Sequence, residues 1–126
     1  MVKEGLLYTK EHEWVRIDGD VVTVGITDHA QEALGEVTFV ELPAVGRDFA
    51  QGAEMAVVES SKTASDIYAP AAGKVINVNA KLAAHPVLVN EDCYGEGWMC
   101  KLKVSGKETG RGLLSAKEYE EYLKGL

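Results

Sequence analysis

One lysine stands alone in a stretch of small and polar residues. Lys62 lies within residues 59–66, Glu-Ser-Ser-Lys-Thr-Ala-Ser-Asp, and is the only basic residue between Arg47 and Lys74. A lysine in a loop is most often only a solvated charge, so its meaning depends on what surrounds it. An ordinary lysine has a pKa of about 10.4, and no apolar cluster adjoins Lys62 to lower that value by burial. The pattern therefore indicates an accessible amine that another enzyme acylates with a pre-activated group, and not a catalytic base.

The segments on either side of Lys62 must hold it in place. An alternating, apolar-rich run covers residues 53–58, and a second run, Ile-Tyr-Ala-Pro, covers residues 67–70. Two β-type runs around a short polar insert are typical of a β-hairpin. The sequence therefore predicts that Lys62 lies at the tip of a hairpin.

The rest of the chain supplies a frame of short strands. The expected strands lie at residues 6–8, 13–17, 21–26, 36–42, 74–78, 87–89 and 98–104. A short helix is expected near residues 28–34, with Asp28 as its cap and Gly35 at its end. A second helix is expected near residues 116–124, where Ser115 and Glu118 form a capping-box pattern. Short strands with few helices indicate a mainly β protein, an antiparallel β sandwich or flattened barrel.

Length and charge restrict the partners. The chain has 126 residues and a net charge of −7, which fits one domain and argues against nucleic acid or an anionic membrane as partner. The first residues contain no apolar leader, and no apolar run approaches the length of a membrane span, so we expect a cytoplasmic protein. Cys93 and Cys100 lack metal-ligand spacing and are expected to be free thiols in a reducing compartment.

Several motifs, in order along the chain, resemble the glycine cleavage system H proteins. Residues 59–73, ESSKTASDIYAPAAG, are similar to the lipoylation hairpin of that family. The similarity extends over about residues 6–123 and also includes EHEWV at 11–15, VGITDHAQEALGEV at 24–37, FVELP at 39–43 and VNEDCYGEGW at 89–98. The chain departs from the family pattern at Cys93, where proline is usual, and at Lys74, where an acidic residue is common. The missing proline could loosen that loop, because proline fixes φ.

The resemblance implies a role for particular residues. It implies lipoate in amide linkage to Lys62, on a single lipoyl-carrier domain of the barrel-sandwich hybrid type that spans residues 1–126. Glu59 and Gly73 are implied as recognition elements for the lipoate-attaching enzyme, although Gly73 can also be explained as a turn glycine with positive φ. Glu13 and Asp66 are candidates for the acidic wall of a groove that holds the arm, with solvated carboxylates as the alternative.

The resemblance also implies a carrier that has no catalytic residue of its own. Its arm would take an aminomethyl group from a pyridoxal-phosphate glycine decarboxylase to a tetrahydrofolate-dependent aminomethyltransferase. A dihydrolipoyl dehydrogenase would then reoxidise the arm by thiol–disulfide exchange. Glycine catabolism and one-carbon metabolism are thus the expected setting, with no metal site.

The residues around Lys62 and the length of the chain bear on other classes of protein that could explain this lysine. Biotin carriers flank their lysine with methionines, whereas Ser61 and Thr63 stand here. The lipoyl domain of a 2-oxoacid dehydrogenase usually precedes a linker and a catalytic domain. A relay that donates lipoyl groups to other proteins fits the same residues as a shuttle does. A stand-alone hydrolase or transferase would need a nucleophile–base pair or a metal cluster, and the sequence displays neither.

Overall fold

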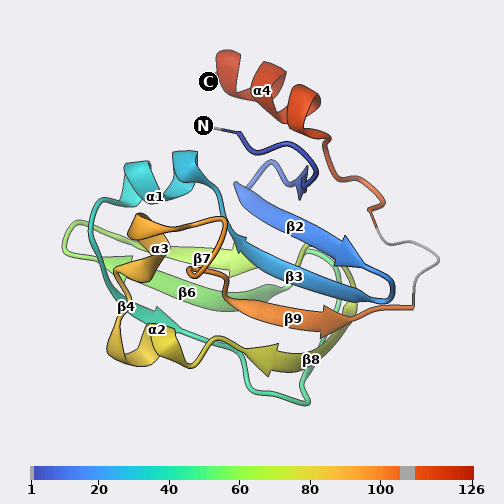
Figure 1. Cartoon of the computed structure of the whole chain (residues 1–126), viewed down its shortest axis with the longest axis horizontal. Helices are drawn as coiled ribbons and strands as arrows, with labels where there is room; N and C mark the ends of the chain where they lie inside the picture. Colours follow the sequence, from blue (N-terminus) through green and yellow to red (C-terminus); the bar gives the residue numbers. More distant parts are fainter. Residues whose placement is uncertain (1, 106–109) are drawn as a thin grey trace.

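Two antiparallel β-sheets face one another in the structure, a computed structural model that describes residues 2–105 and 110–126. The larger sheet has the strand order β1-β2-β3-β9-β8-β5, and the smaller has the order β4-β6-β7 (Figure 1). The strands are β1 (Leu7–Tyr8), β2 (Glu13–Asp18), β3 (Val21–Ile26), β4 (Val37–Glu41), β5 (Asp48–Phe49), β6 (Glu54–Ser60), β7 (Ala64–Tyr68), β8 (Gly73–Val78) and β9 (Cys100–Lys103). The sequence-based expectation of a mainly β, two-sheet sandwich is confirmed.

Alternation of apolar and polar residues fixes which face of each strand is buried. Val22 and Val24 of β3 lie against Val75 of β8 and Leu102 of β9 in one core cluster, which also contains Met55 of the smaller sheet. A second cluster lies under the smaller sheet and contains Val40, Val58 and Ile67. Burial of these side chains holds the two sheets together, because each apolar side chain removed from water stabilises the fold by roughly 1.5–3 kcal/mol.

In the part of the chain that the structure describes, four short helices accompany the sheets: α1 (Asp28–Leu34), α2 (Lys81–Ala84), α3 (Leu88–Glu91) and α4 (Ala116–Lys124). The predicted capping box of α4 is confirmed, since Glu118 N–H donates to Ser115 Oγ and Ser115 N–H donates to the Glu118 carboxylate. Helix α4 lies beside the N-terminal segment, above the larger sheet (Figure 1). Tyr119 and Ala116 pack there against Leu6, Tyr8 and Trp14 in a third cluster.

Trp14 is buried in a space that Gly25 leaves open. A Cβ added at Gly25 would lie 2.5 Å from Cε2 and Cζ2 of the Trp14 indole. The indole Nε1–H donates to the Cys93 carbonyl at 2.8 Å. This hydrogen bond fixes the loop at Cys93, where the proteins that the sequence resembles usually have proline.

Three local predictions were wrong. Residues 87–89 are not a strand: Val87 has helical backbone angles and α3 follows it, because a short apolar run fits a buried helical turn as well as a strand. Thr27, and not Asp28, caps α1, because Thr27 is extended and its Oγ1 accepts the Ala30 N–H. The polar insert is also shorter than expected, since β6 and β7 run on to Ser60 and Ala64. The short elements β5 and α2 had not been predicted.

Candidate functional site

A tight loop closes the hairpin of β6 and β7 and carries Lys62. The last paired residues are Glu59 and Ala64, and Ser60 N–H donates to the Thr63 carbonyl at 2.8 Å. Ser60 Oγ accepts the backbone N–H groups of Lys62 and Thr63, both at 3.3 Å. Lys62 itself is exposed. Both strands and the Ser60 side chain thus hold the loop backbone, while the lysine side chain extends from it.

The end of the Lys62 side chain lies over Gly35, the residue that ends α1. A Cβ added at Gly35 would lie 3.1 Å from Lys62 Cε and 3.5 Å from Nζ. Gly35 has a φ of +79° and its carbonyl accepts from the Asn90 side chain at 2.8 Å. Asn90 also accepts the Val37 N–H at 2.8 Å, so it fixes the turn between α1 and β4. Glycine at this position leaves room for the lysine; sequence analysis had missed this contact and the part played by Asn90.

An open groove of about 340 Å³ separates the hairpin from α1, and both elements lie at the same end of the molecule (Figure 1). Ala30, Ala33 and Leu34 of α1 form one side, and Thr63, Ala64 and Ser65 of the hairpin form the other. Small and apolar side chains next to an exposed lysine leave space for an acyl chain attached to that lysine. We call this space the arm groove.

Two histidines line the arm groove beside Glu11. The rings of His12 and His29 lie 4.4 Å apart between centroids. The two histidines are separated along the chain and lie together only in the folded structure. The third histidine, His85, is exposed and lies 3.3 Å from the Glu91 carboxylate.

Glu13 is buried, with 1 % of its surface exposed. Its carboxylate accepts from Thr9 Oγ1 at 2.6 Å and from the Tyr68 N–H at 3.0 Å. It lines a second hollow of about 490 Å³, which shares Glu11 with the arm groove. Burial raises the pKa of Glu13 above its ordinary value of 4.5, although these hydrogen bonds oppose the shift.

This raised pKa gives Glu13 a predictable effect on stability. The folded state holds the Glu13 proton to a higher pH than the unfolded chain does. The stability from Glu13 is therefore complete below pH 4.5 and is lost as pH rises through the folded-state pKa. Glu13→Gln cannot ionise, and its amide can donate to Thr9 Oγ1 while its oxygen accepts the Tyr68 N–H. We expect urea unfolding across that pH range to give a smaller decline in stability for Glu13→Gln than for the parent chain. An identical decline would refute the assignment.

Asp66 and Glu59 lie on the outer face of the smaller sheet. Asp66 is exposed and pairs with Val57, while Glu59 pairs with Phe39, whose side chain is 50 % exposed. Alternation places these side chains opposite the buried Val58. Asp66 lines neither the arm groove nor the hollow beside Glu13, so the structure does not bring the two carboxylates together in one wall.

Gly73 begins β8 at a point of close backbone approach. A Cβ there would lie 2.6 Å from the Lys103 carbonyl and 3.0 Å from Val104 Cγ1. Gly73 is not among the glycines with positive φ, so its explanation as a left-handed turn residue was wrong. The space between β8 and β9 requires glycine at this position.

The cysteines are free, as predicted, and both are buried. Burial raises the pKa of Cys93 to about 11 and that of Cys100 to about 12, so both thiols are protonated near neutral pH. Among residues 2–105 and 110–126, no group of three or more histidine, cysteine, aspartate or glutamate side chains could hold a metal ion. No helix in the same ranges is long and apolar enough to cross a membrane.

The fold and this site define a class of protein: a two-sheet carrier that presents one lysine on a hairpin beside a groove. The family model described as Glycine cleavage H-protein matches residues 6–126. The chain is 54 % identical over 122 residues to the glycine cleavage system H protein of Herpetosiphon aurantiacus, covering 97 % of this chain and 93 % of that one. It is 56 % identical over 117 residues to the glycine cleavage system H protein of Thermus thermophilus, covering 93 % of this chain and 91 % of that one.

A solved structure agrees with these sequence matches. The crystal structure of a glycine cleavage system H protein from Mycobacterium marinum superimposes with a TM-score of 0.90 at 37 % identity, covering 99 % of this chain and all of the other. The chain therefore belongs to the glycine cleavage H-protein family. Members of this family are non-catalytic lipoyl carriers of aminomethyl groups and components of the glycine cleavage system.

Proposed function

We propose that Lys62 is the lipoyl attachment site and that residues 1–126 form one cytoplasmic carrier domain. The observation that carries this proposal is the position of Lys62: it is exposed on a loop fixed by Ser60, next to the arm groove. An attaching enzyme can reach the amine there without unfolding the hairpin. The groove then offers the attached chain a place on the protein.

The residues around Lys62 fit a lipoyl group. When bound, that group would supply a disulfide that is reduced as it accepts the aminomethyl group, and the dithiol left after transfer would be reoxidised by the dihydrolipoyl dehydrogenase. Ala30, Ala33 and Leu34 would contact its aliphatic chain and exclude water from it. We infer that Glu13 and Asp66 supply negative charge for an ammonium group at the end of the arm. Glu13 would act from the hollow that adjoins the groove, and Asp66 from the outer side of the hairpin.

We infer that three enzymes act on the arm in turn: the glycine decarboxylase, the aminomethyltransferase and the dihydrolipoyl dehydrogenase. A tethered group reaches each docked site at a high effective concentration. The net charge of −7 suits basic docking surfaces on these partners. A fourth partner, the lipoate-attaching enzyme, must recognise the hairpin before any arm is present.

Glu59 and Gly73 are our candidates for that recognition. Glu59 lies beside the exposed Phe39, and Gly73 would act by keeping β8 close to β9. We expect Glu59→Gln to lower kcat/KM for lipoate attachment roughly tenfold, the effect of losing one charge-assisted contact of about 1.4 kcal/mol. Glu41→Gln on the same sheet is the matched control. Equal attachment rates for the parent chain and both variants, measured with a lipoate ligase, would remove Glu59 from the recognition surface.

The attachment itself is tested by intact mass and peptide mapping of protein from lipoate-replete cells. The proposal expects one lipoyl increment located on Lys62, and activity of that protein in glycine–bicarbonate exchange with the decarboxylase. A bare Lys62 in cells, together with failure of a lipoate ligase to load it in vitro, would overturn the proposal.

A further inference from the structure

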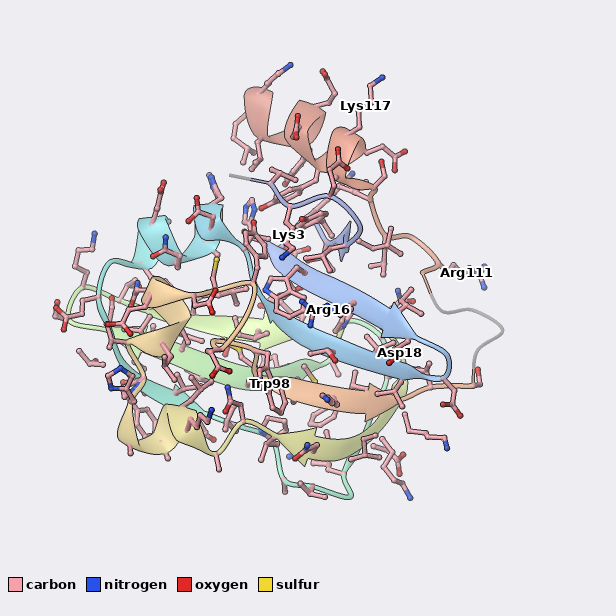
Figure 2. The ribbon with its side chains drawn as sticks, viewed as in Figure 1. Lys3, Arg16, Asp18, Trp98, Arg111 and Lys117 are labelled. Carbon is pink, nitrogen blue, oxygen red and sulfur yellow. The ribbon has the colours of Figure 1, made fainter. Side chains whose placement is uncertain are left out.

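A chain of hydrogen bonds connects the C-terminal helix to the arm groove. The hydroxyl of Tyr119 in α4 lies 2.7 Å from His12 Nδ1 and 2.8 Å from Thr27 Oγ1. Tyr119 is fully buried, and it is 107 residues away from His12 in the sequence. By contrast, Lys117 lies on the side of α4 turned away from the sheets (Figure 2). The buried side of α4 thus contacts residues that belong to the site.

His12 needs such support because its backbone is unusual. Its φ is +71°, the only positive φ among the described residues other than glycine. A side chain in this region is strained and persists only where its surroundings hold it. The Tyr119 hydroxyl and the ring of His29 contact the His12 imidazole, and both histidines line the arm groove.

Thr27 connects the same network to α1, the helix that forms one side of the groove. Its Oγ1 accepts the Ala30 N–H and so caps α1. Ala30 also lines the groove. One hydroxyl on α4 therefore contacts both a histidine that lines the groove and the cap of the helix that forms one of its sides.

We propose that Tyr119 is a positioning residue for the lipoyl arm: through His12 and Thr27 it holds the wall of the groove against which the arm lies. This inference rests on the proposed role of the groove. Tyr119 does not line the groove itself and acts through the residues it contacts. The C-terminal helix is then part of the carrier's working site as well as of its fold.

Tyr119→Phe tests the inference with little change in packing. The phenyl ring can keep its stacking on Tyr8, whose ring lies 4.6 Å away at an angle of 5°. Tyr8→Phe is the matched control, because it also removes a fully buried hydroxyl, one that donates to the Lys3 carbonyl. In the bare protein, we expect the imidazole ¹⁵N resonances of His12 to shift in Tyr119→Phe and to keep their positions in Tyr8→Phe.

The second measurement compares backbone amide resonances of Ala33 and Leu34, which line the groove, before and after lipoylation of Lys62. The parent chain and Tyr8→Phe should display shifts at both residues as the arm enters the groove. Tyr119→Phe should lose most of these shifts, with docking roughly fivefold weaker, the change that loss of one net hydrogen bond produces. If Tyr119→Phe folds poorly, His12→Asn takes its place as the test variant. Asparagine tolerates positive φ, and this variant should cause a similar loss of arm-induced shifts.

The double variant His12→Asn/Tyr119→Phe separates positioning from general stability. If Tyr119 acts through His12, the second substitution adds little to the loss caused by the first. Arm-induced shifts in Tyr119→Phe equal to those of the parent chain would overturn the inference and leave the groove intact. Absence of such shifts in the lipoylated parent chain would instead overturn the proposed docking of the arm in the groove, and with it the role of Tyr119. Attachment at Lys62 would be unaffected by that result.

Discussion

We expect Lys62→Arg to abolish lipoylation and glycine–bicarbonate exchange while the protein remains folded. Arginine keeps the positive charge and a long side chain, but its guanidinium stays protonated in proteins and cannot be acylated as an amine can. The exposed side chain contributes little to the core, so the thermal midpoint should change by no more than an ordinary surface substitution would cause. Loss of function without loss of stability is expected of a carrier, whose activity depends on one attached group.

Lys74→Arg is the matched control for this prediction, because Lys74 is also an exposed lysine on a strand of the same fold. That variant should be lipoylated and should support exchange at the parent rate. Mass spectrometry and the exchange assay on both variants decide the matter. A lipoyl increment on Lys62→Arg, or exchange activity in its absence, would contradict the proposed attachment site.

Gly25→Ala should produce the largest loss of stability among the substitutions considered. The added Cβ would lie 2.5 Å from the Trp14 indole, far inside van der Waals contact. Trp14 has no free space to move into, since it is fully buried and hydrogen-bonded to Cys93. Overpacking of a core costs about 1–3 kcal/mol, and we expect a value near the top of that range from urea unfolding.

Two comparisons make the Gly25 prediction specific. Gly125→Ala introduces the same methyl group where the nearest atom is 3.6 Å away and φ is −87°, so it should change stability very little. Trp14→Phe removes the indole atoms that the new methyl group would meet. The double variant Gly25→Ala/Trp14→Phe should therefore be more stable than the sum of the two single effects predicts. Additive losses would indicate that the contact between Trp14 and Gly25 is not the cause.

Local patterns predicted the hairpin, both main helices and most strands. The capping box at Ser115 and Glu118 and the alternation in residues 53–58 each depend on near neighbours in the chain. Residues 87–89 could not be assigned in this way, because an apolar run of three residues suits either a strand or a helical turn. The burial of Val89 beside Leu82 suits the turn, and that contact is not local.

The candidate site divides in the same manner. Lys62 could be identified from its own segment, because a lone amine among small residues needs no distant partner to be accessible. The positions of Glu13 and Asp66 depended on packing. Glu13 is buried and accepts hydrogen bonds from Thr9 and Tyr68, while Asp66 faces outward. The contact of Gly35 with Lys62 and the part played by Asn90 gave no local signal, since they depend on the approach of the Lys62 side chain to Gly35 and on the hydrogen bond from Asn90 to the Gly35 carbonyl.

The sequence by itself determined the class of fold, the hairpin and the lysine at its tip, because β-alternation, turn residues and capping are set by side chains a few positions apart. Only the tertiary structure decided that the His12 ring lies beside that of His29, that the Tyr119 hydroxyl of the C-terminal helix lies within hydrogen-bond distance of His12, and that a groove opens beside Lys62. The physical reason is that a groove and its wall are formed by side chains brought together by burial of the core. Their separation along the chain, 107 residues for His12 and Tyr119, leaves no periodicity to detect.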